Sequence, residues 1–559
     1  MIPAIFVMEI AIDDRIPTYS GGLGVLAGDM AYSFADLGIP ATFVTLLSRN
    51  GYVSQKLDAA AGQIDSPQPW DWGEVLSPLE PKTTVEVGGK EQTIGAFEYL
   101  IHGNPNSSVL YLNTDYPEND PEVREATNRL YGGEQYHRLL QDIILGIGGY
   151  RVLKALGRRV DVYHLNESHA AFATIELLRD SGSAEATRAR CAFTTHTPIA
   201  AGNDVFPLST VEATLRGHTW VDWGTESEAG GVNLARLASK YCGVTNAVSL
   251  KHKFVSERVV GHNEIAYVTN GAYHRRWVGP EMKKLFDAHL PGWEAHPSLL
   301  VGAMAIPSEQ VAQAHSSAKR LLLASIEARS GLRLEPNVLT ICVAKRITGY
   351  KRNGMILWDP VRLQKLAGGS GGIQIVIAGK THPKDGNAKG MLADIVRKAD
   401  LLNRSGDGVK VAVLENYDIE LAKLLVAGCD VWLNNPRRPL EACGTSGMKA
   451  AMNGGLNLST NDGWWLEGGI EGVNGWGVGR RPEWGDLGES NDQEDQEALY
   501  TRLSNDVLPT FYKNKDIWLE MEKRSMATVG PLFNSYRMVE EYMSKVYSKL
   551  GSLSVYRSP

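Results

Sequence analysis

Residues 338–352 read VLTICVAKRITGYKR. The first seven residues form a short apolar run rich in β-branched side chains, which predicts a buried strand. Four cations come next, Lys345, Arg346, Lys351 and Arg352, so they would stand at the carboxyl end of that strand. Open parallel α/β sheets bind their ligands at this edge. The segment therefore favours an oxyanion site over an ordinary solvated basic loop.

The same alternation of short apolar runs and longer amphipathic stretches extends along the whole chain. Strands are predicted at residues 4–12, 41–47, 160–164 and 192–195, and again at 338–344, 373–378, 409–414 and 430–434. Strands that alternate with helices indicate βαβ units and parallel sheets. We expect an α/β protein with two doubly wound, Rossmann-like lobes.

The length of 559 residues exceeds what a single hydrophobic core usually serves. A strand-like IAYVTN ends in Asn270-Gly271, which marks a boundary near residues 265–280. We expect an amino-terminal lobe at 1–268, a second lobe at 269–525, and a helical segment at 526–559 that packs back on the first lobe.

Composition excludes several classes of protein. Hydrophobic residues make up 43% and charged residues 22% of the chain, which is typical of a folded soluble protein. The net charge of −7 and the scattered cations argue against a nucleic-acid partner. Five distant cysteines indicate neither disulfides nor a metal site, and favour a reducing, cytoplasmic location. No apolar run reaches the ~18 residues that suggest a membrane span.

A glycine-rich loop, Gly21-Gly22-Leu23-Gly24, follows the first predicted strand and precedes a helical stretch. Backbone N–H groups at the start of such a helix approach phosphates or sugar hydroxyls closely. A plain tight turn explains the spacing equally well.

A third motif, EACGTSGMK, occupies residues 441–449. Thr445 or Ser446 is expected to cap a helix whose first N–H groups hold an anion, with Lys449 in about the first turn. A lysine desolvated beside a phosphate pocket forms a Schiff base with an aldehyde cofactor. From spacing alone, an ordinary surface lysine is the commoner outcome.

The run EACGTSGMKAAMNGG resembles the cofactor-lysine segment of the α-glucan phosphorylase family, and KRITGYKR resembles its phosphate-binding segment. Five more segments resemble the family in the correct order: IPTYSGGLGVLAGD, HLNESHA, FTTHTP, VTNGAYHRRW and LENYDIELAKLLVAGCDVWLNNP. The resemblance runs from about residue 9 to about residue 468. It implies the GT-B glycosyltransferase architecture, with the active site in the cleft between two lobes.

The resemblance also implies a pyridoxal 5'-phosphate site. Lys449 would hold the cofactor as an imine. The backbone of Gly444 and Thr445, together with Tyr417 and Lys345, would hold the cofactor's phosphate. No metal is implied.

Substrate-binding roles follow from the resemblance in the same way. Arg346, Lys351 and the Gly22 backbone would bind inorganic phosphate, and His196 joins Arg346 and Lys351 as a catalytic residue. The hydroxyls of the terminal glucose would be read by Glu441, Asn270, His196 and the Leu23 backbone. Glu167 and His169 would lie toward the neighbouring sugar. Without the surrounding motifs, both histidines would be read as structural.

The activity implied is reversible phosphorolysis of the terminal α-1,4-linked glucose of glycogen, starch or maltodextrin, which gives α-D-glucose 1-phosphate with retention. Partners are then the α-glucan and phosphate, and a homo-oligomer is possible. Because the chain begins almost at the first strand, we expect a short form without the regulatory extension of the large members.

The sequence departs from the large members at four positions: Thr348, Gly349, Asp418 and Cys443. Asp418 reverses the sign of an arginine that helps to hold the cofactor's phosphate. Two other interpretations stay open. A nucleotide-sugar glucan synthase has the same two lobes, although it has no use for Lys449 as an imine-forming residue. A non-catalytic glucan-binding relative is the second, and it would lack turnover.

Overall fold

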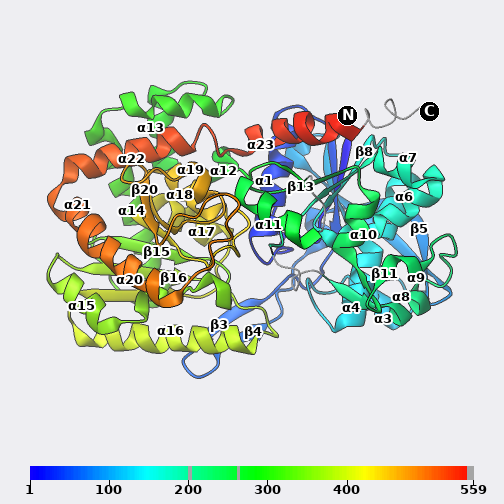
Figure 1. Ribbon diagram of the computed structural model, residues 1–559, viewed down its shortest axis with the longest axis horizontal. Coiled ribbons are helices and arrows are strands. Elements are labelled where there is room, and N and C mark those ends of the chain that lie inside the picture. Colours follow the sequence, from blue (N-terminus) through cyan, green and yellow to red (C-terminus); the bar gives the residue numbers. More distant parts are fainter. Residues whose placement is uncertain (199–203, 261–264, 551–559) are drawn as a thin grey trace. The chain divides into compact units, whose positions relative to one another are not determined.

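A computed structural model of the chain describes residues 1–198, 204–260 and 265–550. These residues form two compact units (Figure 1). Unit 1 contains the described residues of 1–52, 67–269 and 538–550, and unit 2 contains residues 53–66 and 270–537. None of the described helices is both long enough and apolar enough to cross a membrane.

Unit 1 is built on a nine-stranded sheet. The strands lie in the order β14 (Ala266–Tyr267), β13 (Val244–Ala247), β9 (Cys191–Thr194), β8 (Val162–Asn166), β1 (Pro3–Phe6), β2 (Ala41–Leu46), β7 (Ser107–Asn113), β6 (Lys90–Leu100) and β5 (Ser77–Val87). The strands from β14 to β7 run parallel, and β6 pairs antiparallel with both β7 and β5. From β1 the chain builds first toward β2 and later toward β8. The topological switch point therefore lies between β1 and β8.

The core of unit 1 includes the last described segment of the chain. α23 (Ser535–Glu541) and the π-helix η9 (Tyr542–Tyr547) contribute Met538, Tyr542 and Tyr547 to the same apolar cluster as Ile5 of β1. Tyr547 also bonds His164 of β8 through its hydroxyl, 2.8 Å from Nδ1. Residues 551–559 of the expected carboxyl-terminal segment lie outside the described residues.

Unit 2 is built on a six-stranded, wholly parallel sheet. The order is β17 (Val409–Leu414), β16 (Ile373–Ala378), β15 (Thr340–Ala344), β18 (Val431–Asn434), β19 (Leu456–Thr460) and β20 (Gly475–Val478). The strands are buried almost throughout, as expected of a parallel sheet covered by helices on both faces. The switch point lies between β15 and β18.

A hairpin from the first part of the sequence belongs to unit 2. β3 (Ser54–Asp58) and β4 (Gly62–Ser66) lie beside α16 (Gly386–Ser405), as Figure 1 shows. The Asp65 carboxylate pairs with Lys389 Nζ at 2.5 Å, and the backbone N–H of Gln55 donates to Asn416 Oδ1 at 2.6 Å. The predicted boundary at 268/269 assigned this hairpin to the first lobe, whereas the structure places it in unit 2.

The predicted α/β class and its eight strands are confirmed, with shifts at some ends. The first strand is shorter than the predicted 4–12 because the chain bends after Phe6. There, Glu9 accepts hydrogen bonds from the backbone N–H of Ser20 at 2.5 Å and of Gly21 at 3.2 Å. This carboxylate therefore joins the end of β1 to the glycine-rich loop.

Candidate active site

Lys345 stands at the switch point of unit 2, directly after β15. Its Nζ lies 3.0 Å from Oδ1 of Asn435 and 3.3 Å from Oδ1 of Asn434, at the end of neighbouring β18. The residue is 9% exposed, and burial lowers the pKa of its amine well below the usual range, with a further contribution from Lys351. Two neutral amides do not balance a buried cation, so this position favours an incoming anion.

The cation-rich loop after β15 reaches the motif of residues 441–449 through one ion pair. Lys351 Nζ lies 2.5 Å from Oε2 of Glu441. Burial opposes the charge on Lys351, but Glu441 outweighs it and raises the pKa of the amine. Arg346 lies on the same loop and is exposed. The structure thus brings together Lys345, Lys351 and Glu441 at one edge of the sheet.

Glu441 is held on both sides. Its backbone N–H donates to Oδ2 of Asp462 at 2.9 Å, just beyond β19. On the other side Gly444 has φ +76°, and a Cβ there would lie 3.1 Å from Oε1 of Glu441. Glycine is required because the backbone is left-handed and the space is already used by the carboxylate.

Lys449 is not a surface lysine. It lies on α18 (Ser446–Ala451), is 6% exposed, and places Nζ 3.9 Å from the ring centroid of Trp277. Asn453 fixes this arrangement because its Nδ2 donates to the carbonyls of both Trp277 (2.8 Å) and Lys449 (2.9 Å). Sequence reasoning missed the roles of Trp277 and Asn453, although both stand inside motifs that it quoted.

The expected side-chain cap of α18 is wrong. In the described part of the chain the Thr445 side chain makes no capping hydrogen bond, since its backbone is already helical at φ −83° and ψ −7°. Ser446 Oγ instead accepts the indole N–H of Trp432 at 3.0 Å. Thr445 therefore offers its backbone rather than its hydroxyl to this region.

The loop after β17 carries Tyr417, which is half-buried, and then Asp418. The Asp418 carboxylate accepts the N–H of Leu421 at 2.8 Å and caps α17 (Ile419–Gly428). The acidic departure thus has a local structural role, because aspartate is among the preferred N-cap residues.

Asn270, at the start of unit 2, lies beside the same motif. Its backbone N–H faces the thiol of Cys443, two residues from Glu441. The residue is 4% exposed, and Oδ1 has no hydrogen-bond partner among the described residues. A buried unsatisfied acceptor costs about 1–3 kcal/mol, so this oxygen is suited to a hydroxyl donor from a ligand.

In unit 1 the glycine-rich loop lies at the switch point, where α1 (Gly22–Asp36) begins. First-turn amides such as those of Gly22 and Leu23 have no intrahelical acceptor. Gly22 is exposed, and a Cβ there would meet no atom of the described chain within 4 Å. The geometry therefore leaves room for a ligand against this backbone.

Glu167 joins the loops that follow β8 and β9. It is buried with φ +82°, and its carboxylate accepts from the N–H of Ser168 (3.0 Å), the N–H of His196 (2.7 Å) and Thr197 Oγ1 (3.0 Å). A non-glycine residue at this φ is strained, and such strain clusters at functional sites. Three protein donors therefore already bond the carboxylate, and one of them is the backbone N–H of His196.

The two candidate histidines of unit 1 are neutral. Burial lowers the pKa of His196 to about 3, and its Nε2 lies 2.7 Å from Oδ1 of Asn166. Burial likewise lowers the pKa of His169, whose Nε2 is 3.8 Å from Asp204. The Nδ1 of His169 is buried and has no partner within the described ranges. These imidazoles are suited to hydrogen bonding rather than to anion binding.

The candidate residues thus divide into two sets, one in each unit. Unit 2 carries Lys345, Arg346, Lys351, Tyr417, Glu441, Gly444, Thr445, Lys449 and Asn270, and unit 1 carries Gly22, Leu23, Glu167, His169 and His196.

Comparison with known proteins shows what this chain is similar to. Residues 220–469 match the family described as carbohydrate phosphorylase. The chain is 37% identical to a maltodextrin phosphorylase of Thermococcus litoralis and 35% identical to a glycogen phosphorylase of Mycobacterium tuberculosis, in each case over 98% of this chain and 70% of the relative. It is 33% identical to a glycogen phosphorylase of Aquifex aeolicus, over 98% of this chain and 86% of the relative.

Proposed function

Because this chain belongs to the α-glucan phosphorylase family, we propose that it catalyses reversible phosphorolysis of terminal α-1,4-linked glucose from an α-glucan. The products are α-D-glucose 1-phosphate, formed with retention, and the shortened glucan. The observation that carries the proposal is the position of Lys449 on α18, the helix that follows the loop whose Glu441 pairs with Lys351, where it is buried over the face of Trp277.

The residues around Lys449 fit pyridoxal phosphate. A buried primary amine suits an aldehyde cofactor, because lysine amines form Schiff bases with aldehydes. Lys345, with its lowered pKa, and the backbone of Gly444 and Thr445 would hold the cofactor's phosphate, with Tyr417 beside them. When bound, the cofactor supplies a phosphate group that exchanges a proton with the substrate phosphate.

We assign Lys351 and Arg346 to the substrate phosphate. Two opposite unit charges about 4 Å apart attract by about 4 kcal/mol at an effective dielectric constant of about 20. Lys351 shares its charge with Glu441 at 2.5 Å, so the arriving anion competes with this carboxylate. Glu441 is then released toward the glucose hydroxyls, beside the unsatisfied oxygen of Asn270.

The residues of unit 1 are assigned to the sugar. Neutral imidazoles and helix-start amides donate and accept hydrogen bonds without adding charge, which suits hydroxyl groups. His196, the Leu23 backbone and His169 would contact the glucan, while the Gly22 backbone would approach the phosphate. Glu167 keeps His196 in place through its backbone N–H.

One experiment tests the proposal directly. Purified protein is incubated with maltodextrin and pyridoxal phosphate, with and without inorganic phosphate, and glucose 1-phosphate is quantified. We expect product only when phosphate is present. Bound cofactor without phosphate-dependent product would contradict the assignment, and a protein without cofactor or product would favour the synthase or the non-catalytic relative.

The proposal extends to the cellular setting. All five cysteines are buried free thiols, including Cys191 and Cys242 with their sulfur atoms 3.2 Å apart. Because the five cysteines are odd in number and have no disulfide or metal spacing in the sequence, a reducing compartment is favoured, and we propose a cytoplasmic location.

A further inference from the structure

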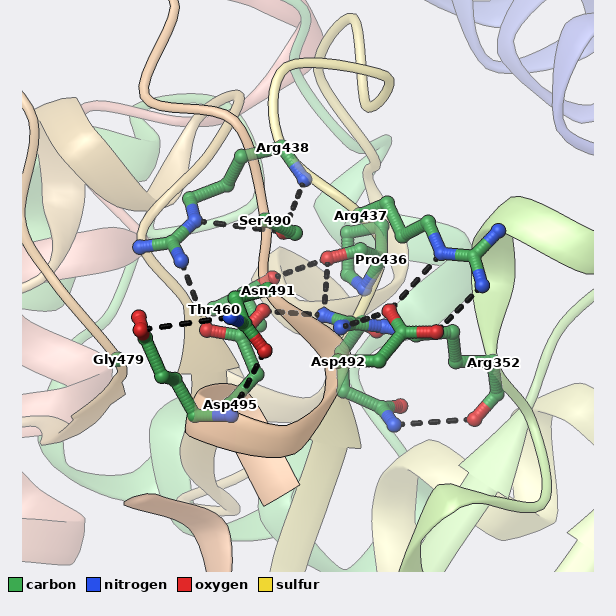
Figure 2. Close-up of polar contacts among 12 residues, drawn as sticks. Arg352, Pro436, Arg437, Arg438, Thr460, Gly479, Ser490, Asn491, Asp492 and Asp495 are labelled. Atoms are coloured by element: carbon green, nitrogen blue, oxygen red, sulfur yellow. Dashed lines mark hydrogen bonds and ion pairs between the residues drawn. The ribbon is translucent and has the colours of Figure 1, made fainter. Parts of the chain in front are cut away.

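Asp495 of α20 (Asp492–Arg502) is a buried carboxylate between two arginines. Its Oδ2 accepts from Nη2 of Arg352 at 2.8 Å, and its Oδ1 accepts from Nη2 of Arg438 at 2.7 Å (Figure 2). The carboxylate side chain is 0% exposed, and the two arginine side chains are 1% and 4% exposed. A charge held so completely away from water must be matched closely by its partners.

Arg352 ends the cation-rich loop, directly after Lys351. Its guanidinium also donates to the carbonyls of Asn435 (Nε, 2.9 Å) and Pro436 (Nη2, 2.8 Å), and its own carbonyl accepts from Asn435 Nδ2 at 3.0 Å. The residue has φ +48°, a left-handed conformation that costs free energy outside glycine. These bonds hold the backbone beside Lys351 in that conformation.

Arg438 lies three residues before Glu441, on the loop after β18. Its backbone N–H donates to Ser490 Oγ at 2.7 Å, and its guanidinium bonds the carbonyl of Arg480 as well as Asp495. The two loops that meet in the Lys351–Glu441 pair therefore each contribute one buried arginine, and both arginines bond the same carboxylate, that of Asp495.

Asp492, one turn earlier on α20, makes a second and more exposed connection. It accepts from Arg352 Nη1 at 3.0 Å and from Arg437 Nε at 2.9 Å, as Figure 2 shows. Its side chain is 34% exposed, compared with 0% for Asp495. The face of α20 that carries both carboxylates thus contacts both loops, with Asp495 as the inner contact.

We propose that Asp495 is a positioning residue for phosphate binding: by holding Arg352 and Arg438 together, it sets the separation of the loops that carry Lys351 and Glu441. The inference rests on the proposed function of those two residues. Without the carboxylate, two buried guanidiniums lose a shared counter-charge and repel, so the loops move apart. Lys351 then loses the position from which it meets the phosphate.

The test compares two substitutions on the same helix. Asp495→Asn keeps the size of the side chain and removes its charge, whereas Glu497→Gln removes a charge from an exposed pair with Arg362. We expect Asp495→Asn to raise the KM for phosphate by about tenfold or more, because small displacements of binding groups have large kinetic effects. The KM for maltodextrin should change less than about twofold, as should both constants in Glu497→Gln. Asp495→Glu, which restores the charge, should recover part of the loss.

An unchanged phosphate KM in a folded Asp495→Asn protein, or an equal rise in both KM values, would overturn the inference. If this variant does not fold, Asp492→Asn takes its place: a selective rise of about threefold in phosphate KM supports the inference, and no rise overturns it.

Calorimetric titration of the wild type and Asp495→Asn with inorganic phosphate separates this inference from the proposed function. Weaker phosphate binding by the variant supports the positioning role even if the wild type forms no glucose 1-phosphate. Equal phosphate binding by both proteins contradicts it.

Discussion

The two units both place candidate residues on loops at the carboxyl ends of parallel strands, yet the electrostatic character of those loops differs. In unit 2 the strand edge at β15 and β18 collects Lys345 and Lys351, and the carboxylate of Glu441 pairs with Lys351. In unit 1 the loops after β1, β8 and β9 carry helix-start amides, His196 with its lowered pKa, and a carboxylate, Glu167, that is already bonded by three protein donors.

The difference shows how one architecture serves two kinds of ligand. The position at the switch point comes from the topology, because the loops on either side of it diverge and leave room. The charge comes from the residues that follow each strand. A surplus of cations suits phosphate groups, whereas neutral donors and acceptors suit sugar hydroxyls. Substitutions in the two units should therefore affect different substrates.

The largest effect is expected from Lys449→Ala. Without the amine that would hold the cofactor, phosphorolysis should fall by more than about a thousandfold, and the purified protein should lose the absorbance of bound pyridoxal phosphate. Lys423→Ala, at a half-buried lysine of α17 that pairs with Glu420, is the control and should keep both properties. Wild-type turnover in the Lys449 variant would contradict the assignment of Lys449 as the lysine that holds the cofactor.

Lys351→Met tests the cationic side of the comparison. The variant keeps the aliphatic stem and removes the charge, so kcat/KM for phosphate should fall by about 10²–10³-fold, as expected for the loss of a few kcal/mol of attraction. The KM for maltodextrin should change much less. Initial rates at varied phosphate and varied glucan measure both, with Lys398→Met on α16 as the control. A loss confined to the glucan would reverse the assignment of the two units.

His196→Asn tests the neutral side. Loss of a hydrogen bond to a sugar hydroxyl costs about 1–3 kcal/mol, so kcat/KM for maltodextrin should fall by roughly 5–150-fold. The KM for phosphate should stay within about twofold. Glu167→Gln should act in the same direction but more weakly, because it loosens the backbone of His196 without removing the imidazole. If either variant raised the KM for phosphate alone, the assignment of the unit 1 residues to the sugar would be contradicted.

Buried histidines also give unit 1 a distinct pH dependence. Burial lowers the pKa of His164 to about 3, while a histidine in an unfolded chain titrates near 6.5. As pH falls below about 6.5, His164 binds a proton in the unfolded state but stays unprotonated in the folded state. Stability is therefore lost progressively down to about pH 3. This single group should remove about 2 kcal/mol at pH 5 relative to pH 7.

Urea unfolding at pH 7 and pH 5 measures this effect. The variant His164→Gln should lose less stability on acidification than the wild type. Tyr547→Phe removes the hydroxyl bonded to His164 but keeps the imidazole, so the pH dependence should persist. Identical pH profiles for the wild type and His164→Gln would show that this group does not contribute.

The smallest effect is expected from Asp418→Asn. Asparagine caps helices about as well as aspartate, so stability, cofactor content and phosphorolysis should stay close to wild type. Asp418→Ala removes the cap of α17 and should cost about 1 kcal/mol of unfolding free energy. If Asp418→Asn changed cofactor binding markedly, the carboxylate would be part of the anion site as well as a cap.

Much of the fold follows from sequence because the apolar runs are short and regularly interrupted. The strand that became β15 and the cations after it were predicted from residues 338–352 alone, and the structure confirms β15 at Thr340–Ala344. The hairpin β3–β4 was not predicted, because its polar strands lack the apolar alternation of a buried strand and their membership of unit 2 depends on distant partners such as Lys389.

The site shows the same limit of local reasoning. Lys449 could be selected from its motif, but spacing alone favoured a surface lysine, and only tertiary packing on Trp277 buries it. The role of Asp495 left no sequence signal, since an acidic residue early in a helix is ordinary. Its partners Arg352 and Arg438 stand 143 and 57 residues away in sequence.

The carboxyl-terminal segment within the core of unit 1 has a consequence for synthesis. Met538, Tyr542 and Tyr547 pack with Ile5, so unit 1 completes its core only after the ribosome has made all of unit 2. Domains generally fold as they emerge, amino-terminal first. Here we expect unit 1 to finish folding after unit 2. The apolar face of the nascent amino-terminal sheet stays exposed until α23 and η9 have been synthesised and cover it.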